Sequence, residues 1–310
     1  MVGVLGWFVA GAAVAAVLWL ALRPTFQASI FARTNYRGVS VPVGTGVVVA
    51  FSVVALVAAK SVGDAVHLSR LLHDTDFASV SSFGVGSSED GASMALSDAT
   101  ALVLSTVVGF ALLGLFDDLG AEGDDRGFGG HLRALRAGRL TTGGVKVLLG
   151  GALALLLAAR VDGQHLWLIP VDGALVALAA NVGNLFDRAP GRTIKVALLA
   201  GIPLLLLCAG ARLHPVAMVL GAAAGLLAFD LREDLMLGDA GSNVLGAIVG
   251  LGVVMTCPVP VRGVVLVVVL LLNLASEKVS FSKVIDGFGP LRFVDRLGRR
   301  RADPPDAAPS

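Results

Sequence analysis

Charged residues and cysteines are both scarce in this sequence. Only 15% of its 310 residues are charged and 55% are hydrophobic, with a mean hydropathy of +0.83. Because soluble globular chains carry about 25% charged residues, this composition excludes an ordinary cytosolic enzyme, and it equally excludes a disordered protein. The two cysteines, Cys208 and Cys257, lie in apolar runs without metal-binding spacing, which excludes a disulfide framework or a zinc site as the organising feature. A net charge of +1 gives no basic excess, so no nucleic-acid partner is expected.

Long apolar runs are what the sequence has in abundance. Since backbone polar groups must be paired within lipid, each run is expected to be a helix. The composition therefore predicts an all-α, polytopic membrane helical bundle. Its expected spans, about nine transmembrane helices, are residues 2–22, 39–59, 99–116, 144–159, 166–186, 194–211, 214–231, 243–258 and 261–276.

The distribution of basic residues predicts the orientation of this bundle. If the chain starts outside, 19 of its 24 Lys and Arg residues fall in inner segments, as the positive-inside rule requires. The N-terminus is therefore expected outside and the C-terminus inside. We expect one transmembrane domain, residues 1–285, with an external loop at about 60–98. Residues 286–310 are expected to form a basic, Pro-containing cytoplasmic tail, disordered at its end and in contact with anionic membrane lipid.

Two adjacent carboxylates, Asp117 and Asp118, follow the third apolar run. At a helix C-terminus each faces the negative end of the macrodipole, which costs about 0.3–1 kcal/mol, and the two repel one another. A hard divalent cation with oxygen ligands, above all Mg²⁺, would compensate them. The alternative is that the pair only marks the water boundary of the helix, and the residues alone leave both interpretations open.

A further carboxylate, Asp239, enters the eighth run between Gly238 and Gly241. Glycines let the backbone approach a ligand closely, although Asp and Ser are also good helix N-caps, so capping by Asp239 or Ser242 is the alternative. The acidic residues just before this segment are interpreted as a solvated loop: Asp230, Glu233 and Asp234.

Three polar residues at the inner end of the fifth run, Asn181, Asn184 and Asp187, are spaced three apart and therefore lie on one helical face. For Asn181 we favour a hydrogen bond to a neighbouring helix. Asp187 is followed by a tight turn that contains Arg192 and Lys195. Cations beside carboxylates suit a diphosphate with its metal.

A basic loop between the third and fourth runs contains Arg133 and leads to Lys146. Positive-inside topology alone explains most of its charge. The position of these two residues, between the paired aspartates and the next helix, also directs them to the same inner face.

Together these segments resemble the polyprenyl-phosphate sugar-1-phosphate transferases (glycosyltransferase family 4), which include phospho-N-acetylmuramoyl-pentapeptide and N-acetylglucosamine-1-phosphate transferases. The resemblance covers roughly residues 30–285. The matching segments are Asn35-Tyr36-Arg37-Gly38 with Val41-Pro42, Phe116-Asp117-Asp118, Thr141-Thr142-Gly143 with Lys146, Asn181/Asn184/Asp187, and Leu237-Gly238-Asp239-Ala240-Gly241-Ser242.

The resemblance implies transfer of a sugar-1-phosphate from a UDP-sugar to polyprenyl (undecaprenyl) phosphate, with Mg²⁺ and release of UMP. It implies that Asp239 is the metal ligand. Asp117 and Asp118 would bind or activate the lipid phosphate, either by covalent attack or by deprotonation. Asp187 would lie at the nucleotide-sugar, with Asn184 beside it.

The remaining substrate-binding candidates are the basic residues Arg133, Lys146, Arg192 and Lys195. The family further implies the cytoplasmic face of a bacterial plasma (inner) membrane, a role in cell-wall biogenesis and a homodimer.

The sequence also departs from the family pattern. Pro190 replaces a second aspartate after Asp187, Met236 replaces an aromatic residue, and the late loop with its histidine cluster is missing. A divergent transferase is therefore the leading hypothesis. A non-catalytic paralogue that binds polyprenyl lipid or scaffolds envelope assembly is the alternative. A transporter ranks last, because ionisable residues are not expected near the middle of any span.

Overall fold

The computed structural model describes residues 2–35, 37–74, 91–120, 141–208 and 210–300. Nine long helices dominate this part of the chain, and between α1 and α2 a two-stranded antiparallel hairpin pairs Ala32 with Pro42. The helices are α1 (Val2–Leu22), α2 (Val47–Asp74), α3 (Gly91–Gly120), α5 (Thr142–Asp162), α6 (Leu168–Phe186), α7 (Arg192–Leu207), α8 (His214–Leu231), α9 (Asp239–Thr256) and α10 (Val259–Ser276). The smaller elements are β1 (Ala32–Thr34), β2 (Ser40–Pro42), α11 (Phe281–Gly287), α12 (Gly289–Arg296) and the 3-10 turns Thr25–Gln27, Ser29–Phe31 and Ala211–Leu213.

This architecture confirms the predicted all-α membrane bundle. Within the described residues, eight helices are long and apolar enough to cross a membrane, so the protein is a multi-pass membrane protein. The ninth, α7, has only 16 residues. The predicted span 39–59 begins too early: the helix starts at Val47, because β2 ends at Pro42 and Gly44 turns the chain with a φ of +73°.

The segment predicted as an external loop is partly helical. Helix α2 has 28 residues, roughly 42 Å at 1.5 Å per residue, which exceeds a hydrocarbon core of about 30 Å. It continues to Asp74, and α3 begins at Gly91. Both helices therefore extend into the 60–98 segment, of which residues 75–90 lie outside the described part of the chain.

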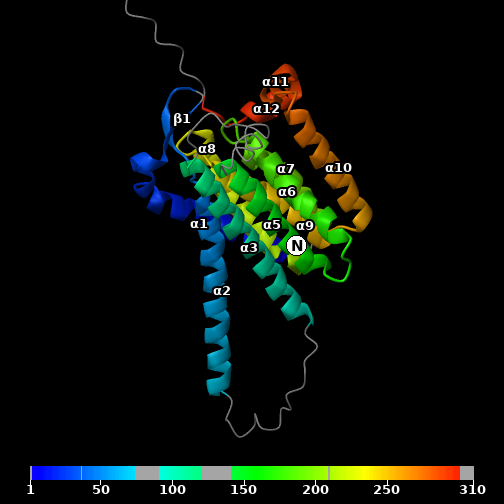
Figure 1. Ribbon diagram of the computed structural model, residues 1–310. Coiled ribbons are helices and arrows are strands. Elements are labelled where there is room, and N and C mark those ends of the chain that lie inside the picture. Colours follow the sequence, from blue (N-terminus) through cyan, green and yellow to red (C-terminus); the bar gives the residue numbers. More distant parts are fainter. Residues whose placement is uncertain (1, 36, 75–90, 121–140, 209, 301–310) are drawn as a thin grey trace, which may run out of the picture.

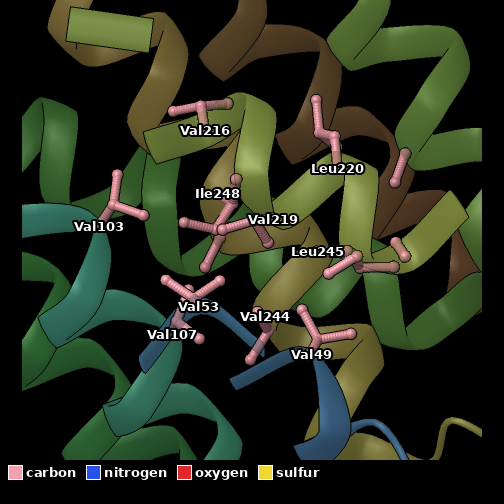
Figure 2. Close-up of a cluster of buried hydrophobic side chains, with 14 of the residues drawn as sticks. Val49, Val53, Val103, Val107, Val216, Val219, Leu220, Val244, Leu245 and Ile248 are labelled. Atoms are coloured by element: carbon pink, nitrogen blue, oxygen red, sulfur yellow. The ribbon is translucent and has the colours of Figure 1, made fainter. Parts of the chain in front are cut away.

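Helix α9 is the centre of the bundle and α10 is its edge (Figure 1). In α9, 78% of the spanning window is buried, against 6% in α10. Figure 2 shows how three neighbouring helices pack on one face of α9. The residues there are Val244, Leu245 and Ile248 of α9, Val49 and Val53 of α2, Val103 and Val107 of α3, and Val216, Val219 and Leu220 of α8. The exposed apolar side chains of α10 suit a lipid-facing helix.

The helices alternate in direction, so residues far apart in sequence meet at the two ends of the bundle. At one end, the last turn of α3 contacts the first residues of α9 and α5, through Asp239 and Lys146. At the other end, Arg262 at the start of α10 pairs with Asp162 at the end of α5. We call the first of these the site end, because it holds the candidate residues described next.

Candidate active site

The start of α9 is held by a carboxylate from another helix. Asp118 Oδ1 accepts a hydrogen bond from the backbone N–H of Asp239 (2.9 Å), and its Oδ2 accepts one from that of Ala240 (3.0 Å). These are among the backbone donors that a helix N-terminus leaves without an intrahelical partner. Asp118 therefore caps α9 and fixes the position of Asp239.

The glycines around Asp239 serve this packing. Gly238 has a φ of +66°, and a Cβ there would lie 2.5 Å from Asp118 Oδ2. A Cβ on Gly241 would lie 2.8 Å from the Cα of Gly46, at the start of α2. Within the protein these glycines admit the side chain of Asp118 and the backbone of Gly46, and their close approach to a ligand stays a prediction.

Four helices each contribute one polar side chain to a cluster at the site end, which we call the Lys146 cluster: Asp117 of α3, Lys146 of α5, Asn184 of α6 and Asp239 of α9. The ammonium of Lys146 lies 3.2 Å from Asp117 Oδ2 and forms a second ion pair with Asp239. Asn184 joins them. With its amide turned to the orientation that satisfies both groups, the nitrogen donates to Asp239 Oδ1 (2.8 Å) and the oxygen accepts from Lys146 Nζ (3.1 Å).

The charged members of this cluster are partly exposed. The side chains of Lys146, Asp117 and Asp239 are 16%, 17% and 20% exposed. Lys146 is held in place because Thr141 caps α5, its hydroxyl accepting a hydrogen bond from the backbone N–H of Gly144 (3.1 Å). Two carboxylates, Asp117 and Asp239, therefore face one ammonium, while Asp118 is occupied by the backbone of α9.

The oxygen donors of the cluster suit Mg²⁺. Within the described residues no group of three His, Cys, Asp or Glu side chains is placed to hold a metal ion. Mg²⁺, however, is usually bound by only one or two carboxylates together with substrate phosphates and water. Asp117 and Asp239 are two carboxylates of the kind required, and in this structure both pair with the ammonium of Lys146.

Asp187 lies directly after α6, at the edge of the cluster. Its carboxylate accepts a 3.4 Å hydrogen bond from the hydroxyl of Thr193. Burial raises the pKa of Asp187 well above its usual range, and the negative charges of Asp230, Asp239 and Asp118 raise it further.

Asp230 is a residue whose position the sequence interpretation missed. It is buried at the end of α8, where its Oδ2 accepts the backbone N–H of Gly191 (2.9 Å), so it does not lie in a solvated loop. Glu233 is also engaged, accepting hydrogen bonds from Asn35 (2.6 Å) and Arg37 (3.1 Å) of the hairpin. The available signal was a carboxylate ending an apolar run, the same pattern that singled out Asp117.

The predicted basic residues separate into two groups. Lys146 lies in the cluster, whereas Arg192 and Lys195 are directed to the C-terminal helices. Arg192 pairs with Asp295 of α12 and donates to Ser282 of α11, and Lys195 donates to backbone carbonyls at the end of α12. Arg133 lies outside the described residues. Asn181 donates to Asn273 of α10 (2.5 Å), which confirms its predicted helix–helix hydrogen bond.

Comparison with known proteins supports the resemblance seen in the motifs. No family model matches the chain. It is similar to a phospho-N-acetylmuramoyl-pentapeptide-transferase of Moorella thermoacetica, with 32% identity over 178 residues, which are 53% of this chain and 56% of that protein. The chain thus spans about half the length of this curated relative.

The residues between β2 and α2 also contact the site end. Thr45 Oγ1 donates to the carbonyl of Met236 (2.7 Å), and the backbone N–H of Gly46 donates to that of Leu237 (3.0 Å). The turn between β2 and α2 therefore supports the segment that leads into Asp239.

Proposed function

We propose that this protein is a divergent, Mg²⁺-dependent phosphoglycosyl transferase that moves a sugar-1-phosphate from a UDP-sugar to polyprenyl (undecaprenyl) phosphate. The reaction would take place at the cytoplasmic face of a bacterial plasma membrane. The observation that carries this proposal is the Lys146 cluster, in which four helices bring two carboxylates, an ammonium and an amide to one end of a membrane bundle. The similarity to a curated phosphosugar transferase supports the same reaction class.

In this reaction an oxygen of the lipid phosphate attacks the phosphorus that carries the sugar. The bond from that phosphorus to the oxygen it shares with the uridine-bearing phosphate breaks, and UMP leaves with the electron pair. Asp117 would bind or deprotonate the lipid phosphate. Asp118, whose two oxygens both accept hydrogen bonds from α9, would act by positioning Asp239.

Asp239, together with Asp117, would hold Mg²⁺. Bound there, the ion would offset the charge that develops on the departing UMP phosphate. Lys146 would bind the diphosphate of the donor as a compact point charge. Asn184 and Asp187 would border the nucleotide-sugar, Asn184 through the same amide that contacts Asp239.

A non-catalytic lipid-binding relative is the second candidate. One observation favours it: Lys146 pairs with both Asp117 and Asp239, so the chain itself supplies a cation between these carboxylates. Such a protein would bind polyprenyl phosphate at the site end without turnover.

The test is UMP release by the purified protein in detergent, with undecaprenyl phosphate, Mg²⁺ and a panel of UDP-sugars. We expect release with at least one donor, dependent on both lipid and Mg²⁺ and lost in Asp239→Asn. The matched control is Asp286→Asn, since Asp286 is an exposed residue of α11. Silence across the panel, with retained binding of undecaprenyl phosphate, would favour the second candidate.

A further inference from the structure

The residues after the last span fold back onto the loop that carries Asp187. We call Phe281–Arg300, which comprises α11, α12 and the four residues after α12, the C-terminal clasp. Its strongest contact is between Asp295 and Arg192, the first residue of α7. The guanidinium binds both carboxylate oxygens, at 2.8 and 3.0 Å, and both side chains are only 5% exposed.

A second basic side chain binds the end of α12. Lys195 Nζ donates to the carbonyls of Val294 (3.0 Å), Asp295 (2.8 Å) and Leu297 (2.6 Å). The last carbonyls of a helix lack intrahelical partners and carry partial negative charge, so an ammonium is favourable there. Two cations in the first turn of α7 are thus both occupied by the clasp.

The clasp also contacts the Asp187–Gly191 loop and the helix before it. Arg299 Nε donates to the carbonyl of Pro190 (3.1 Å). The ring of Phe186, the last residue of α6, stacks on Phe281 with centroids 5.3 Å apart. On its other side the loop is bound by Asp230, through the backbone N–H of Gly191. The Asp187–Gly191 loop is therefore held by contacts at the residue before it, at Pro190 and Gly191 within it, and at Arg192 after it.

We propose that the C-terminal clasp is a positioning element of the active site, with Arg192 and Asp295 as positioning residues that hold the Asp187–Gly191 loop against the Lys146 cluster. This inference rests on the proposed function for its catalytic consequence. It assigns Arg192 and Lys195 an indirect role in place of the substrate contacts predicted from the sequence. A tail that only met lipid head groups would have no need of a buried, bidentate ion pair.

The charge state of the pair suits a permanent contact. Burial alone would raise the pKa of Asp295, but the hydrogen bonds and charge of Arg192, with Arg299 and Lys195 adding to them, lower it below its usual value. Asp295 therefore stays ionised throughout the neutral range, and the clasp does not open by titration of this group.

The experiment compares Asp295→Asn with Asp286→Asn. Asp286 is the matched control because it belongs to the same clasp and pairs with Arg296, yet that pair is 53% and 63% exposed. One readout is hydrogen exchange at the amides of residues 187–192, and the other is the separate kcat and KM for UMP release. Lys195→Gln is a second variant that weakens the clasp without leaving Arg192 unpaired.

For Asp295→Asn and Lys195→Gln we expect faster exchange in the loop and a fall in kcat of about ten-fold, with Asp295→Glu recovering part of both. Asp286→Asn should match the wild type. The proposal is overturned if Asp295→Asn and Asp286→Asn give the same loop exchange and the same kcat. It is equally overturned if Asp295→Asn raises turnover, because the clasp would then obstruct the site. If the wild type releases no UMP, the proposed function fails, while loop exchange still decides whether the clasp holds the loop.

Discussion

Each end of the bundle places one basic side chain between two aspartates, and the two arrangements differ in instructive ways. At the site end Lys146 lies between Asp117 and Asp239. At the opposite end Arg262 lies 3.0 Å from Asp162 and 2.7 Å from Asp172. We call the second group the Arg262 triad. It joins α5, α6 and α10.

The Arg262 triad is more deeply buried than the Lys146 cluster, and its cation donates to a backbone carbonyl as well as to two carboxylates. Asp172 is 0% exposed and Arg262 12%, against 16% to 20% for the charged side chains of the Lys146 cluster. Arg262 also donates through Nε to the carbonyl of Cys257 (2.8 Å). A planar guanidinium fixed by three acceptors cannot move without losing them, whereas an ammonium on a flexible stem can. The triad therefore suits a permanent fastening, and the cluster suits a site that a ligand rearranges.

The largest expected effect distinguishes these two roles directly. Asp239→Asn should reduce Mg²⁺-dependent UMP release by roughly 1,000-fold, about 4 kcal/mol of transition-state stabilisation. The backbone N–H that binds Asp118 is retained, so the thermal midpoint in detergent should change little.

Asp172→Asn is the counterpart at the opposite end. Its turnover per folded molecule should equal that of the wild type. If Asp239→Asn is as active as the wild type, Asp239 is not a metal ligand.

The next largest effect concerns stability. Arg262→Ala leaves two buried carboxylates without their cation, which should lower the free energy of unfolding by about 3 kcal/mol. Thermal and chemical denaturation in detergent measure this loss. Arg160→Ala is the matched control, since Arg160 is exposed near the same end of the bundle. Equal free energies of unfolding in the two variants would show that the triad does not stabilise the fold.

A smaller effect is expected within the cluster itself. Lys146→Ala should raise the KM for the nucleotide-sugar about ten-fold, roughly 1.4 kcal/mol, because a point charge for the diphosphate is lost. Lys278→Ala removes an exposed lysine after α10 and should leave KM unchanged. If KM is the same in both variants, Lys146 does not bind the diphosphate of the donor.

The spans and most of the cluster could be predicted from the sequence because both depend on local patterns. Apolar length identifies a span, and a carboxylate at its end marks a boundary, which is how Asp117 and Asp239 were found. What local patterns do not carry is the partner of each charge. Asp118 caps a helix 121 positions away in sequence, and Arg192 pairs with a residue 103 positions away. No spacing rule links such residues, since helix packing alone brings them together.

The Arg262 triad escaped prediction for the same reason. The sequence assigns no role to Asp172, which is the fifth residue of α6 and therefore lies near the end of a span rather than at its middle. Its full burial depends on Asp162 and Arg262, which come from two other helices. The predicted orientation of the bundle stays a prediction, although all the candidate residues described lie at the end expected to face inside.

The smallest expected effect is a pH dependence at the edge of the cluster. Burial, with the nearby charges of Asp230, Asp239 and Asp118, raises the pKa of Asp187 well above 3.8. At a pH between 3.8 and the raised pKa, the Asp187 carboxyl is protonated in the folded protein and ionised in the unfolded chain. The free energy of unfolding therefore falls as pH rises through this range, by at most about 1.4 kcal/mol per pH unit. Thermal midpoints of the wild type and Asp187→Asn, measured without Mg²⁺ from about pH 4 upward, isolate this group as their difference. The difference should shift in favour of Asp187→Asn as pH rises, and a shift in the opposite direction would mean that the loop stabilises the ionised carboxylate.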